Sequence, residues 1–123
     1  MSEIISLDLN HQQLFGWELE KSDLVIDAII RGIEAGDEFP PVPVHQENGN
    51  YYLSPLRETP DGISDAGHYR AIGHYIANKP LKCELLNGGP IWPDNMMIPI
   101  PQISIVDDSG QLQEHKNRFP QYR

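Results

Sequence analysis

An amphipathic segment in the first third of the chain sets the first limit on its fold. Ser22 can cap a helix, and Asp23 follows in the first turn, where a carboxylate stabilises the helix dipole. Gly36 then permits a left-handed cap at the other end. Between them, apolar residues recur at three- and four-residue spacing and form one stripe: Ile26, Ile29, Ile30 and Ile33. The pattern predicts a helix over about residues 22–36 with one face on a core.

The next stretch favours strands and a tight turn. Residues 39–44 contain three prolines, which predict an entry loop leading into a short strand at 42–44 rather than a central antiparallel strand. Asn48-Gly49 tolerates the positive φ values of a two-residue hairpin loop. Residues 51–53 are the expected returning strand.

A second helix is predicted to begin near residues 67–69 and to stop before Pro80. Its buried face comes from residues at helical spacing: Ala71, Ile72, Tyr75 and Ile76. Residues 82–86 form the next predicted strand. Helices separated by short strands predict an α+β fold, a small mixed sheet with two main helices.

The remaining segments carry weaker signals. Residues 3–9 alternate weakly and predict a first strand, whereas residues 11–20 look like a polar connection from which Phe15 and Trp17 dock on the core. Residues 54–64 are rich in turn residues, residues 97–106 form a proline-interrupted extended stretch, and residues 107–123 are a predicted turn and peripheral tail. With 123 residues in total, we expect a single domain over 1–123.

The charge of the chain is large and unevenly distributed. Eighteen acidic side chains against nine basic ones give a formal charge of −9. Residues 1–47 hold ten acids and two bases, a net of −8, whereas residues 48–86 hold four of each. Because proteins neutralise a phosphate backbone with clustered Lys and Arg, this acidity argues against nucleic acid as a partner. A small anion can still bind in the balanced middle third, and the acidic third is expected to be a solvated surface.

The single cysteine and the lack of long apolar runs restrict the remaining classes. Cys83 excludes an internal disulfide and lies in an alternating apolar run, which favours a buried strand thiol over a nucleophile. No segment approaches the ~20 apolar residues of a membrane span, and the N-terminus lacks a signal pattern. We therefore expect a cytoplasmic protein that does not enter a membrane.

The candidate ligand site is Gly67-His68-Tyr69-Arg70, where an irregular loop becomes the second helix. A helix start presents unpaired backbone N–H groups and the positive end of the dipole, and both favour anions. Gly67 permits close approach of a ligand to the backbone, Arg70 offers a charged planar fork, and His68 can donate to the same group. The segment predicts a phosphate or carboxylate site.

Two further side chains extend this candidate site. Asp65 is placed to cap the helix or to hold a metal ion beside a phosphate, and His74 shares a helix face with Arg70. His68 and His74 are six positions apart and lie on different helix faces. Since the other histidines (His11, His45 and His115) have no partner at ligand spacing, we predict no metal site built by the chain alone.

The order of these segments resembles that of the ParB/sulfiredoxin superfamily, in particular its standalone ParB-like N-terminal domains. The shared pattern is a helix ending in glycine, a proline-led Val-x-Val strand, a Tyr-x-Leu strand and a Gly-x-x-Arg signature that opens the next helix. The likeness covers residues 22–86. It implies a ParB/sulfiredoxin-like fold and a nucleotide, accompanied by Mg²⁺, whose phosphates lie at Gly67 and Arg70.

The chain departs from this family inside the signature itself. The catalytic cysteine of sulfiredoxin and the glutamate of ParB both fall at His68, and the first arginine of ParB falls at Tyr69. Standalone members carry an aspartate before the glycine, where this chain has Ala66, with Asp65 one position earlier. The resemblance therefore does not extend to sulfinic-acid reduction or to an established metal ligand. The helix-turn-helix domain of ParB proteins has no counterpart in this sequence.

Three functions are compatible with these residues, and whether the protein is an enzyme stays open. The first is a domain that binds a nucleotide or another small phosphate ligand through Gly67, His68, Arg70 and His74. The second is a non-catalytic interaction module, in which the acidic face of the first helix (Asp23, Asp27 and Glu34) meets a basic protein partner, or a homo-oligomer. The third is a nuclease or nucleotide hydrolase with Asp65 and His68 as candidate catalytic residues.

Overall fold

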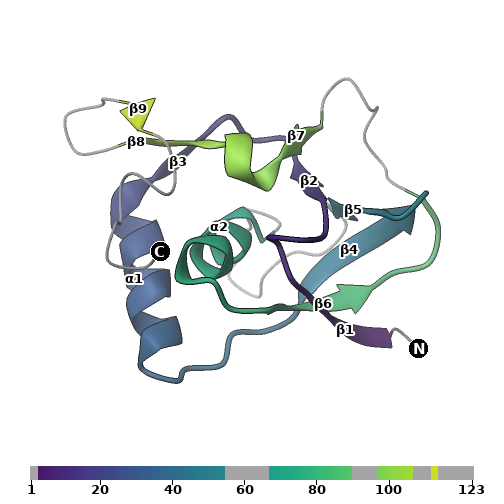
Figure 1. The fold of residues 1–123 in the computed structure, drawn as a ribbon, viewed down its shortest axis with the longest axis horizontal. Coiled ribbons are helices and arrows are strands. Elements are labelled where there is room, and N and C mark those ends of the chain that lie inside the picture. Colours follow the sequence, from purple (N-terminus) through teal and green to yellow (C-terminus); the bar gives the residue numbers. More distant parts are fainter. Residues whose placement is uncertain (1–2, 55–66, 90–96, 107–111, 114–123) are drawn as a thin grey trace.

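The computed structural model describes residues 3–54, 67–89, 97–106 and 112–113, and it has the predicted α+β fold (Figure 1). The elements are, in order, β1 (Glu3–Leu7), β2 (Leu14–Gly16), β3 (Glu20–Ser22), α1 (Asp23–Glu34), β4 (Val42–Glu47), β5 (Asn50–Leu53), α2 (His68–Ala77), β6 (Leu81–Leu85), β7 (Ile98–Pro99), the 3₁₀ helix η2 (Ile100–Gln102), β8 (Ser104–Val106) and β9 (Leu112–Gln113).

The main sheet is mixed and has six strands in the order β1-β6-β4-β5-β2-β7. Strand β4 lies parallel to β6 and antiparallel to β5, while β2 lies parallel to β5. β1 is antiparallel to β6 and forms one edge. A second, three-stranded sheet has the order β3-β8-β9 and continues from the β2–β3 segment (Figure 1).

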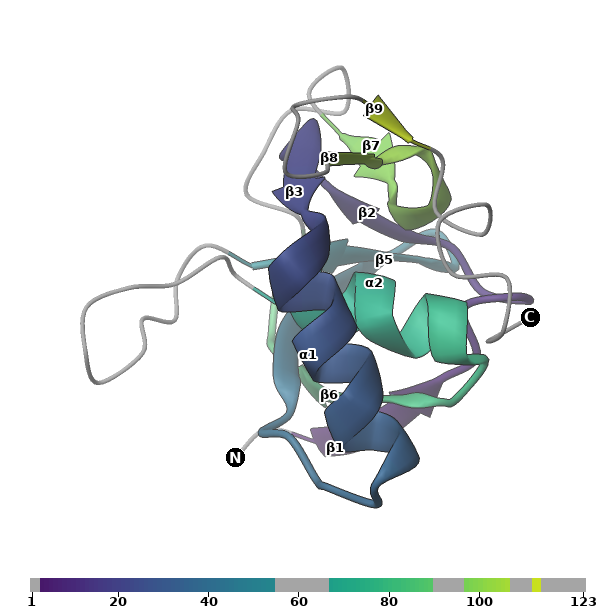
Figure 2. The same cartoon turned by 90° about the vertical axis from the view of Figure 1, so that its left-hand side faces the viewer.

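Helix α2 lies on the concave side of the main sheet, and α1 packs on the side of α2 that faces away from the sheet (Figures 1 and 2). The two helices pack closely, since a Cβ added at Gly73 of α2 would lie 2.5 Å from Cγ2 of Ile29 in α1. The core joins both helices to the sheet through fully buried apolar side chains, among them Leu7, Ile26, Ile30, Leu53, Ile72 and Ile105. Helix α2 is therefore held between the sheet and the first helix.

The structure confirms both helices and the hairpin. Gly36 has a φ of +88° just beyond the end of α1, as its predicted capping position requires. Asn48 and Gly49 have φ values of +53° and +82° between β4 and β5, as expected for a two-residue loop. Ser22 occupies the N-cap of α1 but makes no side-chain capping bond.

Two predictions about strands were wrong. Residues 11–20 are not only a connection, because they contain β2 and the start of β3. The proline-rich stretch was also expected to stay out of a central antiparallel strand, but β4, which contains Pro43, lies between β6 and β5 and is antiparallel to β5. The Pro43 carbonyl accepts a hydrogen bond from the Ser54 N–H, one position beyond the end of β5. The backbone N–H that proline lacks would therefore lie at the end of the β4–β5 ladder, where its absence removes little of the strand pairing.

Several predictions concern residues that lie outside the described part of the chain. Of the predicted loop at 54–64, only Ser54 is described, and of the predicted tail at 107–123, only the two residues of β9. Within the described ranges, neither helix has the length and apolar character needed to cross a bilayer.

Candidate functional site

Gly67 fixes where α2 begins. It has a φ of +95°, and its carbonyl accepts the first helical hydrogen bond, from the Ala71 N–H at 2.9 Å. A Cβ at this position would lie 2.4 Å from Cγ1 of Val42 in β4. The glycine is therefore required by its backbone conformation and by close packing against the central strand. The sequence located this glycine correctly, but its packing reason is visible only in the structure.

His68 lies in the interior and is 0% exposed. Its Nε2 accepts hydrogen bonds from the backbone N–H groups of Trp17 at 3.1 Å and Glu18 at 3.4 Å. Since Nε2 accepts, the ring proton lies on Nδ1, which is 3.4 Å from the Glu18 carboxylate. Both ring nitrogens thus face protein groups, and the contacts hold the start of α2 against the β2–β3 segment.

The β2–β3 segment is shaped to receive this imidazole. A Cβ at Gly16 would lie 2.4 Å from Nε2 of His68, so only glycine fits there. The Trp17 ring meets the imidazole edge-on, with 4.7 Å between the ring centroids. Direct contact of His68 with a ligand would require breaking this arrangement, so the geometry favours a positioning role.

A buried cation lies beside the same helical turn. Lys21 is 8% exposed; its Nζ forms an ion pair with Glu18 and lies 4.4 Å from the centroid of the Tyr69 ring. The Tyr69 hydroxyl in turn accepts a hydrogen bond from the Ser22 N–H at 3.2 Å. Glu18 and Lys21 were not predicted as site residues, because nothing in residues 11–22 indicates that they meet a helix about 50 positions later.

Arg70 connects α2 to the proline-rich loop before β4. Its Nη1 donates to the carbonyl of Pro40 at 2.6 Å and lies 3.4 Å from that of Pro41. The side chain is half-buried. These contacts fix the guanidinium near the start of α2, on the side of the loop that enters β4.

His74 lies one turn further along α2 and bonds to the backbone of Arg70. Its Nδ1 is 2.7 Å from the Arg70 carbonyl, to which it donates, and its ring meets Phe39 edge-on. Burial lowers the pKa of His74; the carbonyl bond opposes this shift and the charge of Arg70 adds to it. The neutral imidazole favoured near pH 7 supplies no positive charge for an anion.

The structure thus brings Gly67, His68 and Arg70 together in the first turn of α2, with His74 one turn away. Asp65, the candidate cap, metal ligand and catalytic residue, lies outside the described residues. Among the residues that the structure describes, Arg70 is the one that combines a permanent positive charge with a half-buried position at the helix start.

A second histidine pairing, between His45 and Ser54, was not among the predictions made from the sequence. His45 and Ser54 are both buried, with 3.0 Å between Nε2 and Oγ, and among the described residues His45 Nδ1 has no hydrogen-bond partner. The signal that could have found them is the hairpin register. An Asn48-Gly49 turn pairs Val44 with Leu53 and therefore makes residues 45 and 54 diagonal neighbours.

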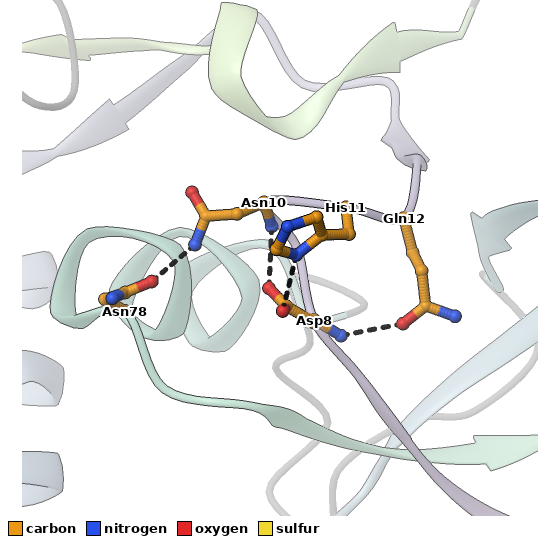
Figure 3. A network of polar contacts seen from close by, with 5 residues as sticks. All are labelled: Asp8, Asn10, His11, Gln12 and Asn78. Atoms are coloured by element: carbon orange, nitrogen blue, oxygen red, sulfur yellow. Dashed lines mark hydrogen bonds and ion pairs between the residues drawn. The ribbon is translucent and has the colours of Figure 1, made fainter.

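A polar network occupies the turn after β1 (Figure 3). Asp8 accepts hydrogen bonds from the Asn10 N–H at 3.0 Å and from His11 Nδ1 at 2.7 Å, and its own N–H donates to the Gln12 side chain at 2.8 Å. The bond to His11 is the main reason that the pKa of Asp8 is lowered. Asn10 bonds to Asn78, which joins this turn to the end of α2.

This turn also borders a cleft of about 250 Å³ between Leu14, Tyr75 and Ile100. The exposed Asp8 and His11 side chains bond to each other, and the network explains how the turn is held. It brings no cationic cluster to the cleft, so it adds nothing to an anion site.

Cys83 is a buried strand thiol, as predicted. Burial raises its pKa to about 12, so the thiolate needed for nucleophilic or metal chemistry is suppressed at neutral pH. Within the part of the chain that the structure describes, no three His, Cys, Asp or Glu side chains are grouped to hold a metal ion.

No family model, no curated protein and no solved structure matches this chain. The resemblance to the ParB/sulfiredoxin superfamily rests on the order of segments over residues 22–86 and on the Gly67-His68-Tyr69-Arg70 signature.

Proposed function

We propose that the protein is a standalone ParB/sulfiredoxin-like domain that binds a nucleotide or another small phosphate-containing ligand at the start of α2. The observation that carries the proposal is the placement of Arg70: a permanently charged side chain is fixed in the first turn of a helix whose start is pinned to the central strand by Gly67. An anion there gains from the helix dipole and from a charge-assisted bond.

The roles within the site differ from those expected of the signature. Arg70 and the backbone of the first turn are the proposed ligand contacts, and Gly67 sets their position. His68 is a positioning residue, because it holds the helix start through the Trp17 and Glu18 amides. His74 is not proposed as a ligand contact, since the lowering of its pKa disfavours a cationic imidazole.

Binding is favoured over hydrolysis by the burial of His68. A general base must reach the proton that it removes, and His68 is enclosed with both ring nitrogens directed at protein groups. A nucleotide would bring Mg²⁺ with it, and Asp65 is the residue to test as its ligand.

The interaction-module alternative has less support than the sequence suggested. Asp23 is only 3% exposed and so does not belong to a surface, and Asp27 pairs with Arg31 at 2.7 Å. The predicted acidic face of α1 is therefore reduced and partly neutralised.

Isothermal titration with CTP, ATP and inorganic pyrophosphate, each with Mg²⁺, tests the proposal. We expect at least one of them to bind to the wild type, and Arg70→Gln to weaken that binding about 10- to 100-fold, the effect of losing a charge-assisted hydrogen bond. Arg31→Gln is the matched control, because it removes an exposed arginine from α1 and should leave the affinity unchanged.

Two results would overturn this function. One is that none of the three probes binds at concentrations up to about 1 mM, because a dissociation constant above that value is too weak for a specific site of this kind. The other is equal affinity in Arg70→Gln and wild type, provided that thermal melts show both proteins folded.

A further inference from the structure

Strand β1 presents an open edge of the main sheet. Its inner side pairs with β6 over its full length, from Glu3 opposite Leu85 to Leu7 opposite Leu81. None of the residues that the structure describes pairs with its outer side, and β1 is the outermost strand beside the N-terminus in Figure 1. An outer edge carries a row of backbone N–H and C=O groups that can pair with another strand.

The two edges of this sheet differ in how they are protected. The opposite edge, β7, has only two residues, and one of them is Pro99, which cannot donate a hydrogen bond. β1 has five residues with neither proline nor lysine. Its Ile4 side chain is 54% exposed on the face away from the core, whereas Leu7 is buried. Such an edge, with an exposed β-branched residue, is suited to pairing with a further strand.

We propose that β1 pairs in an antiparallel manner with β1 of a second copy of this chain, around a two-fold axis at Ile5. The main sheets of both copies then form one continuous sheet. In this register Glu3 lies opposite Leu7 of the other copy, and Ile4 lies opposite Ser6. The two Ile4 side chains become diagonal neighbours on the same face, within reach of each other.

The strand itself favours a second copy as the occupant. Glu3 is its only charged residue, and in the symmetric register it faces an apolar residue, so no like charges lie directly opposite. A symmetric pair of β1 edges also closes on itself. A head-to-tail arrangement would require β7, which is too short and carries a proline.

Salt dependence separates this occupant from a basic peptide that could add to the same edge. Each copy carries a charge of −9, so the copies repel at long range and added salt should strengthen their pairing. A basic peptide would be attracted by the same charge, and salt would weaken its binding.

Sedimentation equilibrium on the full chain tests the proposal. We expect the mass to rise from 13.9 kDa toward twice that value as the concentration increases from about 10 μM to about 1 mM, and to rise further with salt. Ile4→Lys should abolish the rise while leaving the fold intact, because a lysine there lies beside Glu84 of its own chain. Leu24→Lys is the matched control, since Leu24 is a 62% exposed residue on α1 and its variant should dimerise as the wild type does.

Crosslinking tests the register. A mixture of Ile4→Cys and Ser6→Cys chains, mildly oxidised, should give mainly the mixed disulfide, because residues 4 and 6 lie opposite each other. The buried Cys83 should not compete, since burial raises its pKa to about 12.

A wild type that stays at 13.9 kDa at every concentration and salt level would overturn the proposal. Dimerisation unaffected by Ile4→Lys, or crosslinks formed equally within each variant alone, would overturn the β1 interface. Because these measurements use no ligand and no residue of α2, their outcome is independent of the proposed phosphate site.

Discussion

Gly67 meets two conditions at once at the start of α2. Its backbone is in the left-handed region, and its missing side chain leaves room for Val42. Gly49 meets only the first condition, because a Cβ there would meet nothing within 4 Å. The two glycines therefore separate the backbone effect from the packing effect.

We predict that Gly67→Ala lowers the free energy of unfolding by about 1–3 kcal/mol more than Gly49→Ala does. Both variants suffer the left-handed strain of about 1–2 kcal/mol, but only the first must also displace the side chain of Val42. Urea denaturation of both variants measures the difference. Equal losses would show that the contact with Val42 relaxes without cost.

Helix α2 is the element that most of the site depends on, and its fit against α1 is tight. Gly73 approaches Ile29 so closely that an added methyl group would lie 2.5 Å from Cγ2. Glycine is unfavourable inside a helix by about 1 kcal/mol relative to alanine, so its presence here indicates a packing requirement.

Gly73→Ala should therefore destabilise the wild type despite its better helix propensity. In an Ile29→Ala background, which removes Cγ2, the same substitution should become neutral or stabilising by up to about 1 kcal/mol. A double-mutant cycle by chemical denaturation measures the coupling. The helix contact would not be responsible if Gly73→Ala had the same effect in both backgrounds.

His74 should make the stability of α2 depend on pH. Its pKa in the folded protein is below the ordinary value of 6.5, so the unfolded chain takes up a proton first as the pH falls. The stabilising contribution is therefore complete above about pH 6.5 and decreases as the pH falls below that value, until the folded pKa is passed.

Unfolding free energies at pH 7.5, 6.5 and 5.5 check this direction. We expect His74→Leu to lose less stability than the wild type over that range, whereas Tyr75→Phe, a substitution at the next position of α2, should keep the wild-type slope. A steeper slope in His74→Leu would contradict the assignment.

Local signals were enough to predict α1, α2 and the β4–β5 hairpin. The isoleucine stripe and the Asn48-Gly49 turn each depend on residues close in sequence. β2 and β3 were missed because each has three residues and pairs with strands that lie far along the chain. A pattern that short carries no periodicity by which it could be recognised.

The candidate site also divides into features that neighbouring residues predict and features that depend on distant parts of the chain. The signature located the start of α2 and the residues in it, but not what those side chains do. His68 is buried by bonds to residues about 50 positions earlier, and Arg70 is held by carbonyls 30 positions earlier. These contacts arise only from the topology, so the residues could be named from the sequence but their roles could not be assigned from it.

At the scale of the whole molecule, the net charge of −9 limits the size of an anionic ligand. A single nucleotide bound as proposed would touch only the start of α2, whereas a duplex would also lie against the acidic third of the chain. Non-specific DNA-binding proteins normally achieve dissociation constants of about 10⁻⁴–10⁻⁶ M through Lys and Arg contacts.

We therefore predict no saturable binding of a fluorescein-labelled DNA duplex at protein concentrations up to about 100 μM in 0.15 M salt, as measured by anisotropy. Saturable binding that weakens with added salt would show that a basic surface escapes the overall charge. The nucleotide titrations described above provide the control for a folded and active sample.

The pairing of early strands with late ones also has a consequence for how the chain is made. Residues 3–7 pair with residues 81–85, and residues 20–22 pair with residues 104–106. A ribosome releases the N-terminal strands long before their partners exist, and non-local pairing of this kind is slow to form. During synthesis, β1 has both of its backbone edges unpaired until β6 emerges. The growing polypeptide is therefore most prone to self-association before its first strand has reached its place in the sheet.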